Sequence, residues 1–450
     1  MENKPKRSTF RARLEVMITT LRHEILTGER EVGSFLPSEL DIAKIFNLSK
    51  NSVRKGLEVL ESEALIEKVP RVGSRILKLS DRVTINFGYY PSLIIESNLN
   101  ALVEKFHQKY PHIHLNMIPV RFHHSSPTLK DYLESDEIDV ISINNHNFEL
   151  FSDKGQKPQL LEPLYSTEGI YPFLTEPFVR DGSLYVQPFI FSPVILCYNK
   201  QHFIDSNVPE PDSSWTWETV KQASSQLTEG KDRYGLFFHF LSDNRWPIFL
   251  LQNGVAFQRG NDIVEPKVDL GALKESLQTL MDLVEHVFPP FLSEDHYDTN
   301  MLFLQQKVSM ILTTYYALNF FRDADFEYDI SPIPYLKYPK TLLNIIGFGI
   351  NKNSKHKEAA KIFIDFMSSY KTQLSIRQNT LSIPSLKSAA EATLDGQGSV
   401  NTPSRYYIYR ETIPTFTDHT ALNITYSELI KVRQQVKLYL SKLEDLDVFI

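Results

Sequence analysis

Residues 36–60 read LPSELDIAKIFNLSKNSVRKGLEVL, and this stretch decides the fold of the N-terminal part of the chain. Ser38 precedes Asp41 by three residues, a spacing similar to a capping box, so a helix should begin at Ser38 and run to Phe46. Ser49 is a favourable N-cap for a further helix, whose buried positions recur at helical spacing. These positions are Val53, Leu57 and Leu60. Two short helices joined by a tight turn form a helix-turn-helix unit.

Two flanking segments complete a winged helix. Before the unit, apolar residues recur every three or four positions and predict a helix that ends near Gly28. These residues are Leu14, Ile18, Leu21 and Ile25. After the unit, residues 66–77 predict a β-hairpin whose tip carries Arg71 and Gly73. A wing of this kind can reach the minor groove or the DNA backbone.

The second helix of the unit should enter the major groove with its N-terminus first. Its early exposed positions carry side chains that can pair with phosphates or base edges. These positions are Lys50, Asn51, Ser52, Arg54 and Lys55. Residues 1–80 hold 15 Lys and Arg against 11 Asp and Glu, a net charge of +4, whereas the remainder carries −11. A basic head on an acidic body is consistent with DNA binding by the head.

In the order of its residues, this segment resembles the winged helix of GntR-type bacterial regulators over about residues 12–77. The matching positions are Ile25, Gly28, Val32–Gly33, Leu36–Glu39, Ile42–Ala43, Ser49–Lys50, Val53–Arg54, Leu57, Leu60 and Leu65–Ile66. The resemblance implies a homodimer that binds a palindromic operator in double-stranded DNA. The DNA-binding residues expected on this basis are Ser38, Ser49, Lys50, Asn51, Ser52 and Arg54, with Arg71 and Gly73 in the wing.

Four positions depart from the pattern of that family. Leu40 stands where Arg is usual, and Lys50 stands where Arg is frequent. The family prefers Ala at Gly56 and Gly at Ala64. Loss of an Arg contact could weaken binding or change the operator, but the helix patterning and the other polar positions survive. The alternative is a winged helix that contacts protein instead of DNA.

The rest of the chain alternates strands with helices, which predicts an α/β fold. Residues 83–88 and 113–118 have strand patterns, and a helical face separates them. That face consists of Leu99, Leu102, Val103 and Phe106. Residues 139–143 form a short apolar strand typical of a buried parallel sheet.

This second region resembles the sugar-binding proteins of ABC importers, the family 1 solute-binding proteins. The segments that carry the resemblance are 101–111, 113–115, 139–141, 161–164, 181–189, 198–200, 208–211, 215–217, 307–310, 349–352 and 358–360. The resemblance implies two α/β lobes joined by a hinge, with a ligand cleft between them. The expected domains are a DNA-binding domain at 1–77, a short linker at 78–82, and a two-lobed periplasmic-binding-protein-like domain at 83–450.

Candidate ligand contacts follow from the chemistry of carbohydrates. Sugars present flat C–H faces, which aromatic side chains can cover, and many hydroxyls, which polar side chains near strand ends can bind. The candidates are Tyr89, Tyr90, Asn144, Asn145, Trp246, Tyr315, Tyr316 and Phe348. The chain contains 21 Tyr, 29 Phe and 3 Trp, so ordinary core packing is the alternative for each aromatic candidate.

The sequence offers little for catalysis, metals or membranes. HExxH, GxSxG, P-loop and CxxC motifs are absent, and the acidic run 323–329 lacks the Gly of an EF-hand. We therefore expect no enzyme activity, no metal and no cofactor. No apolar signal-peptide core follows residues 1–7, and polar residues interrupt the apolar stretch 301–321. The sequence therefore predicts a cytoplasmic protein without a membrane partner.

Together these features predict a transcription regulator. A small ligand, a carbohydrate or a derivative of one, would close the cleft and change the operator affinity of a dimer. One alternative is a second region that has lost its ligand and serves as a dimerisation or protein-interaction scaffold. Another is an enzyme with an appended DNA-binding domain, which the missing catalytic motifs argue against. A candidate dimer surface is the C-terminal helix with Leu429, Val432, Val436 and Leu440.

Overall fold

The computed structural model describes most of the chain. The described residues are 7–26, 28–62, 65–77, 83–121, 128–152, 158–258, 267–289, 293, 295–393 and 401–445. The expected linker at 78–82 lies outside them, so the expected domain boundaries stay predictions. Among the described residues, no helix combines the length and the apolar character that crossing a membrane requires.

The first unit is a winged helix with its own apolar core. It consists of α1 (Arg7–Leu26), α2 (Glu39–Ile45), α3 (Lys50–Ser62), β1 (Ile66–Val69) and β2 (Gly73–Ile76). Ser38 caps α2, because its hydroxyl oxygen accepts from the Asp41 N–H at 3.2 Å. Ser49 accepts from the Ser52 N–H at 3.3 Å at the start of α3. The core contains the residues expected from the helical pattern, among them Ile18, Leu21, Ile25, Val53, Leu57 and Leu60.

The wing is an antiparallel pair of β1 and β2. Its tip needs unusual backbone angles, with φ of 67° at Arg71 and 146° at Gly73. Gly73 adopts its angle without a steric penalty, whereas Arg71 does so as a single left-handed residue in a tight turn. The predicted hairpin is confirmed.

A continuous mixed sheet runs through the second region. Its strands lie in the order β4 (Ile113–Pro119), β3 (Val83–Tyr89), β5 (Val140–Asn144), β14 (Thr341–Ile350), β8 (Gln187–Asn199), β12 (Val308–Thr314) and β9 (Tyr234–Phe237). The pairs β3–β4, β3–β5 and β12–β9 are parallel, as the alternation of strands and helices predicts. The α/β fold class is confirmed.

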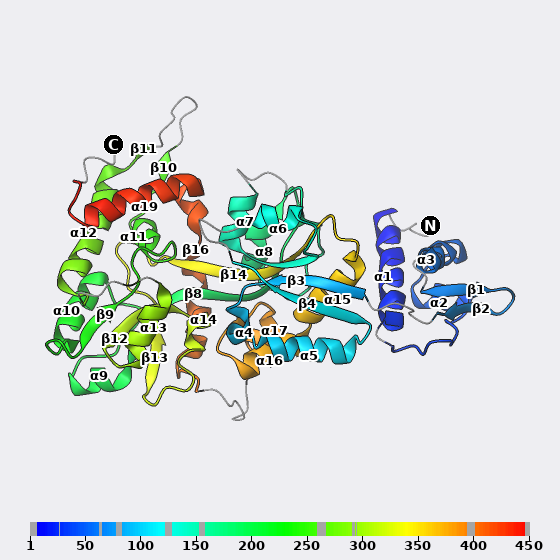
Figure 1. Cartoon of the computed structure of the whole chain (residues 1–450), viewed down its shortest axis with the longest axis horizontal. Helices are drawn as coiled ribbons and strands as arrows, with labels where there is room; N and C mark the ends of the chain where they lie inside the picture. Colours follow the sequence, from blue (N-terminus) through cyan, green and yellow to red (C-terminus); the bar gives the residue numbers. More distant parts are fainter. Residues whose placement is uncertain are drawn as a thin grey trace, which may run out of the picture.

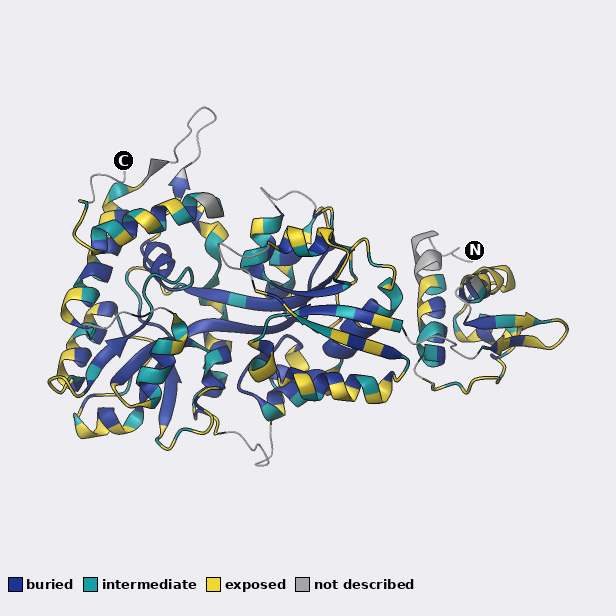
Figure 2. Ribbon diagram, viewed as in Figure 1, coloured by how far each residue is buried: buried dark blue, intermediate teal, exposed yellow. Residues whose placement is uncertain are grey.

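Strands β8 and β14 connect two lobes (Figure 1). Residues 187–193 of β8 pair with β14, and residues 194–198 pair with β12. Every residue of β8 is buried, because both faces of the strand are covered. Figure 2 shows the same burial along both crossing strands. We call the part built on β4, β3 and β5 lobe 1, and the part built on β12 and β9 lobe 2.

Helices cover the sheet in both lobes. Those of lobe 1 are α4 (Leu93–Glu96), α5 (Leu99–Lys109), α6 (Leu129–Glu134), α7 (Asn145–Phe151), α8 (Pro172–Thr175), α15 (Lys357–Ser368), α16 (Tyr370–Asn379) and α17 (Lys387–Ala390). Those of lobe 2 are α9 (Lys200–Asp205), α10 (Trp217–Leu227), α11 (Trp246–Gln252), α12 (Leu270–His286), α13 (His296–Leu304) and α19 (Tyr426–Leu440). Helix α14 (Tyr315–Leu318) lies against β8. Helix α18 (Tyr409–Thr412) lies near the same strand, because the Tyr409 ring meets the Phe191 ring edge-on with centroids 5.9 Å apart.

Helix α1 links the winged helix to lobe 1 (Figure 1). Arg22 pairs with Glu358 of α15 at 3.3 Å, and the ring of His23 meets Tyr110 edge-on at 6.3 Å between centroids. Leu26 packs against the apolar core of lobe 1. The first unit therefore contacts one lobe directly, which gives a route for a lobe movement to reach the DNA-binding helices.

Candidate functional site

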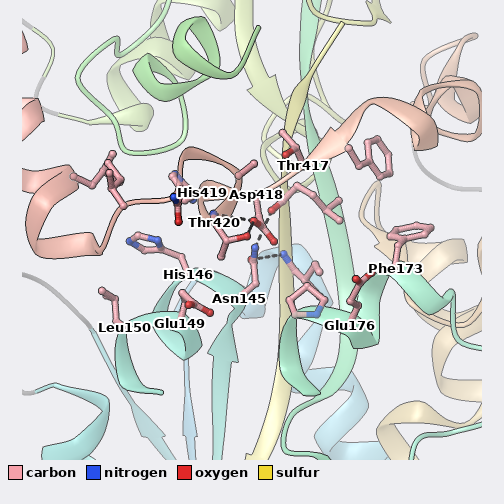
Figure 3. Close-up of a pocket in the computed structure, with 18 of the residues that line it drawn as sticks. Asn145, His146, Glu149, Leu150, Phe173, Glu176, Thr417, Asp418, His419 and Thr420 are labelled. Atoms are coloured by element: carbon pink, nitrogen blue, oxygen red, sulfur yellow. Dashed lines mark hydrogen bonds between the residues drawn. The ribbon is translucent and has the colours of Figure 1, made fainter. Parts of the chain in front are cut away.

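A cavity of about 940 Å³ lies beside the crossing strands, where the two lobes meet. Its lobe 1 side comes from α7 and from η1 (Glu176–Phe178), which follows α8. The opposite side comes from residues 416–425 and the start of α19, which packs on the core of lobe 2. Figure 3 shows side chains from these elements converging on one space. Its volume lies within the range of small-molecule sites.

Asn145 anchors the lobe 1 wall to the crossing strand β14. Its Nδ2 donates to the Leu343 carbonyl at 3.1 Å, and its Oδ1 accepts from the Ile345 N–H at 3.0 Å. Both backbone groups lie beyond the point where β14 pairs with β5, so a side chain supplies the bonds. Asn145 is buried and lines the cavity, as Figure 3 shows.

Replacing Asn145 with Ala should destabilise the protein by about 2 kcal/mol, because two buried backbone groups lose their partners. Chemical denaturation of the full chain would measure the change. Asn147→Ala on the same helix is the matched control, since in the described part of the chain Asn147 Nδ2 bonds to a side chain, the Tyr90 hydroxyl, and to no backbone group. Equal denaturation midpoints for the Asn145→Ala protein and the wild type would contradict this role.

An ion pair between Arg180 and Glu149 lies in the lobe 1 wall of the cavity. Arg180 Nη2 contacts Glu149 Oε2 at 2.5 Å and Ser152 Oγ at 3.1 Å. The guanidinium also lies over the Phe148 ring at 5.0 Å from its centroid. The pair holds a carboxylate at the cavity edge, where it can accept hydrogen bonds from hydroxyl groups.

The C-terminal wall is a short turn rich in hydrogen-bonding groups. It contains β16 (Phe416–Thr417) and η4 (His419–Leu422). Asp418 caps η4 by accepting from the Thr420 N–H at 2.9 Å and from the Thr420 hydroxyl. This capping fixes the carboxylate at the cavity surface.

Two histidines meet across the cavity. The ring of His146 on α7 lies 5.0 Å from that of His419, centroid to centroid. His419 Nε2 is 2.5 Å from the Asp243 carbonyl of lobe 2. Burial, and then the neighbouring His419, lowers the pKa of His146 to about 3; burial also lowers the pKa of His419. Both rings are therefore neutral near pH 7 and can donate or accept hydrogen bonds.

Aromatic surface completes the site. Phe173 and Phe416 meet edge-to-face with centroids 5.6 Å apart, and both line the cavity. Apolar faces beside carboxylates, hydroxyls and neutral imidazoles suit a polyhydroxylated ligand. Among the described residues, no group of three or more His, Cys, Asp or Glu side chains could hold a metal ion.

The structure brings one of the eight sequence-predicted ligand residues to this cavity, namely Asn145. Its neighbour Asn144 caps α7 by accepting from the Asn147 N–H at 2.6 Å. The Tyr90 hydroxyl accepts from the Asn144 N–H at 3.1 Å, and Tyr89 is half-buried at the end of β3. Asn144 and Tyr90 therefore support the start of α7 behind the lobe 1 wall, whereas Tyr89 packs against the lobe 1 core.

The other four predicted ligand residues are buried beside or behind the crossing strands. Tyr315 donates its hydroxyl to the Tyr406 carbonyl at 2.8 Å, and Tyr316 bonds to the Ile190 and Asn344 carbonyls. Phe348 lies in the lobe 1 core. Trp246 is fully buried in lobe 2, and its Nε1 has no hydrogen-bond partner among the described residues. No observation of ligand binding tests these assignments, which stay predictions.

Most predicted DNA-binding residues lie on exposed surfaces of the winged helix. The exposed residues are Ser38, Ser49, Lys50, Asn51, Arg54, Arg71 and Gly73. Arg54 forms an ion pair with Glu39 of α2 at 2.9 Å and keeps 55% of its side chain exposed. Ser52 differs, because it is buried and its hydroxyl lies 2.7 Å from that of Ser49. Its position supports the start of α3, and its predicted DNA contact remains untested.

Sequence reasoning missed the segment 416–420. This segment lies about 270 residues from Asn145 along the chain, so no local sequence pattern predicts that the two lie close together. A weak signal was present, because an aromatic residue, two threonines, Asp418 and His419 stand together before the last helix.

Comparisons with known proteins identify both parts of the chain. The family model described as bacterial extracellular solute-binding protein matches residues 90–374. The chain belongs to this solute-binding protein family. A second model, bacterial regulatory proteins, gntR family, matches residues 15–76, so a gntR-family domain precedes the solute-binding protein region. Both resemblances expected from the sequence are confirmed, and both are non-enzymatic kinds of protein.

Solved structures of solute-binding proteins share the fold of the larger region. One is the ABC substrate-binding protein Lmo0181 from Listeria monocytogenes in complex with cycloalternan, with TM-score 0.66 and 20% identity, covering 82% of this chain and 96% of that one. Another is a solute-binding protein from Thermotoga lettingae bound with alpha-D-tagatose, with TM-score 0.68 and 17% identity, covering 82% and 97%. At these identities the similarity shows the fold alone.

A curated relative matches the N-terminal part. It is the uncharacterized HTH-type transcriptional regulator YieP of Escherichia coli (strain K12), 26% identical over 91 residues. The match covers 20% of this chain and 40% of that relative's length.

Proposed function

We propose that this solute-binding protein family member is a transcription regulator whose gntR-family domain binds operator DNA, and whose cavity binds a carbohydrate that changes operator affinity. The DNA-binding domain is residues 1–77, the linker 78–82 and the effector domain 83–450. The protein acts as a homodimer in the cytoplasm. The observation that carries the proposal is the cavity between the lobes of a chain whose gntR-family domain docks on lobe 1.

The cavity chemistry supports a carbohydrate. Phe173 and Phe416 supply apolar faces for C–H surfaces, and Glu149 and Asp418 supply carboxylates for hydroxyl groups. The solved relatives that carry cycloalternan and alpha-D-tagatose share this fold and agree with that chemistry.

The linkage between ligand and DNA follows from the contacts of α1. A ligand that joins lobe 1 to the segment 416–425 favours one arrangement of the lobes. Because α1 packs on α15 and on Tyr110, the winged helix follows lobe 1. In a dimer this movement changes the distance between two recognition helices, to which operator binding is sensitive. A coupling of about 1–3 kcal/mol is typical of allosteric proteins.

A thermal-shift screen of the full chain against mono- and oligosaccharides tests the proposal. A ligand at about 100 times its dissociation constant adds about 2.7 kcal/mol of stability and should raise the melting temperature visibly. The affinity of a ligand found in the screen should fall about tenfold or more in the Phe416→Ala variant, which lacks an aromatic face of the cavity. Tyr370→Ala, at an exposed aromatic outside the cavity, is the matched control.

Two results would count against this function. A hit whose affinity is unchanged in Phe416→Ala places the ligand elsewhere. No shift across the panel, with DNA binding intact, favours a dimerisation or protein-interaction scaffold.

A further inference from the structure

A cluster of basic and polar side chains lies in lobe 2, outside the cavity lining. We call it the basic cluster and define it as His239, Ser242, Arg245, His296 and Thr299. The first three lie in the loop between β9 and α11, and the other two lie one turn apart on α13.

Arg245 is the unusual member. It is 2% exposed, and its guanidinium donates to two backbone carbonyls, from Nε to Leu312 at 3.3 Å and from Nη1 to Asn244 at 3.0 Å. Among the described residues, no carboxylate lies within ion-pair distance of it. Burial lowers the pKa of Arg245 to about 9, so the side chain stays charged at neutral pH. A buried charge without a counter-charge is unfavourable, and proteins normally pair it.

Two other buried arginines have their charges compensated in different ways. Arg233 pairs with Glu229 at 2.6 Å, and the Arg377 guanidinium lies over the Tyr406 ring at 4.0 Å from its centroid. Among the described residues, Arg245 has neither a carboxylate nor an aromatic ring against its guanidinium, which bonds only to backbone carbonyls there. The difference indicates that a negative group absent from the chain itself completes the environment of Arg245.

The neighbours of Arg245 provide hydrogen-bonding groups. His239 and His296 pack edge-to-face with centroids 5.6 Å apart. Burial lowers the pKa of both imidazoles, and the positive charge of Arg245 lowers them further. His296 Nε2 bonds to Ser242 Oγ at 2.8 Å, whereas its Nδ1 is buried and has no partner in the described part of the chain. The buried Thr299 hydroxyl likewise has no partner there.

Acidic side chains near the cluster have another role. Burial lowers the pKa of His239, and the charges of Asp295 and Asp298 oppose that shift without reversing it. Asp295 Oδ1 accepts from the Tyr297 N–H at 2.7 Å and caps α13. Neither carboxylate forms an ion pair with Arg245.

The loop that holds Arg245 also reaches the cavity. The Asp243 carbonyl contacts His419 on the cavity wall, and Asn244 Nδ2 donates to Asn344 Oδ1 of β14 at 3.2 Å. An occupant of the basic cluster would therefore act on a segment that touches the C-terminal wall and a crossing strand.

We propose that the basic cluster binds an oxyanion, a phosphate group that is either free or carried by a sugar, with Arg245 as its charged anchor and with His239, His296 and Thr299 as hydrogen-bond donors. Arginine and phosphate form strong charge-assisted hydrogen bonds. Binding of a sugar phosphate rests on the proposed function above, whereas binding of free phosphate does not.

Calorimetric titration of the full chain with inorganic phosphate, and then with hexose 6-phosphates and their parent sugars, tests the site. Phosphate should bind to the wild type, and the Arg245→Met variant should bind it about 30-fold or more weakly, because truncating one member of a buried charge pair has an effect of this size. Because Arg245 is buried and its replacement could unfold the protein, His296→Asn serves as a second variant at a half-buried position. Matched controls are Arg233→Met, a buried arginine of the same lobe, and the exposed His286→Asn.

The outcomes separate this site from the proposed function. Phosphate binding that needs Arg245 and His296, with a sugar phosphate binding more tightly still, supports the site and a phosphorylated effector. Phosphate binding that no sugar or sugar phosphate exceeds supports a free-anion site and contradicts the carbohydrate ligand. If neutral sugars stabilise the protein while phosphate and sugar phosphates bind no better to wild type than to Arg245→Met, the anion site is wrong and the proposed function stands.

Discussion

Replacing Lys50, Asn51 and Arg54 together with Ala should lower operator affinity about 100-fold or more and leave the fold of both domains intact. The three side chains are exposed on the first turns of α3, the surface that a recognition helix presents to the major groove. Each good base contact contributes about 1–3 kcal/mol, and each phosphate contact adds a salt-dependent term. The operator can be selected from random DNA with the wild-type protein, and affinities measured by fluorescence anisotropy.

The control variant removes positive charges from lobe 1 instead of from the winged helix. Lys130→Ala with Lys371→Ala changes exposed residues of lobe 1 and should leave DNA affinity within a factor of about two. The slope of affinity against salt should fall only in the triple variant, because only that variant removes positive charges that bind DNA phosphates. Wild-type affinity in the triple variant would show that α3 is not the recognition helix.

Arg54 requires a separate comparison. Its ion pair with Glu39 links α3 to α2, so Arg54→Ala alone changes both a DNA contact and a surface pair. An exposed pair contributes at most about 1 kcal/mol to stability, which circular dichroism of the variant can verify. The Glu39→Gln variant frees Arg54 and should raise DNA affinity slightly, since the guanidinium no longer has a competing carboxylate.

The sequence allowed accurate prediction of the winged helix because its signals are local. Ser38 and Ser49 act as caps within four residues of the groups they bond, and the buried faces follow helical spacing. Ser52 shows the limit of this reasoning. It follows two exposed positions, yet it lies on the side of α3 that turns inward, one residue before the core residue Val53.

The candidate site was harder to predict because its walls come from distant segments. The rule that ligands lie at the carboxyl ends of parallel strands led to Asn145, which follows β5 and lines the cavity. The same rule selected Tyr316 and Phe348, but it gives the edge of the sheet and not the direction of each side chain. Both rings point into the packed core, and the wall opposite Asn145 comes from the segment around Asp418, far along the chain.

The crossing strand β14 tolerates no side chain at Gly347. A Cβ atom there would lie 2.4 Å from the Gln187 carbonyl oxygen, 2.9 Å from its carbon and 2.7 Å from Val186 Cγ1. Two of these atoms belong to the backbone of β8, and β14 is paired with β5 on its other edge. Neither β5 nor β8 can move away from β14 without breaking the backbone hydrogen bonds that pair the strands, so the clash must distort the sheet.

Gly347→Ala should therefore destabilise the effector domain by about 3 kcal/mol or more, at the upper end of what overpacking causes. The control is Gly271→Ala near the start of α12, where the nearest atom to an added Cβ is the Asp269 carboxylate at 3.3 Å. That change should be neutral or stabilising by up to about 1 kcal/mol, because Ala favours helix over Gly. Denaturant unfolding followed by tyrosine and tryptophan fluorescence would measure both.

The position of Gly347 makes this variant informative about function as well as stability. The register of β14 against β8 shifts between Ile346 and Gly347, two residues beyond the backbone groups that Asn145 holds at the cavity wall. Distortion at this point should loosen the connection between the lobes before it reaches the winged helix, which has a separate core. We expect Gly347→Ala to keep DNA binding at low temperature while losing any response to ligand. Loss of both activities in parallel would mean that the effector domain is needed to hold the DNA-binding domains in their dimeric arrangement.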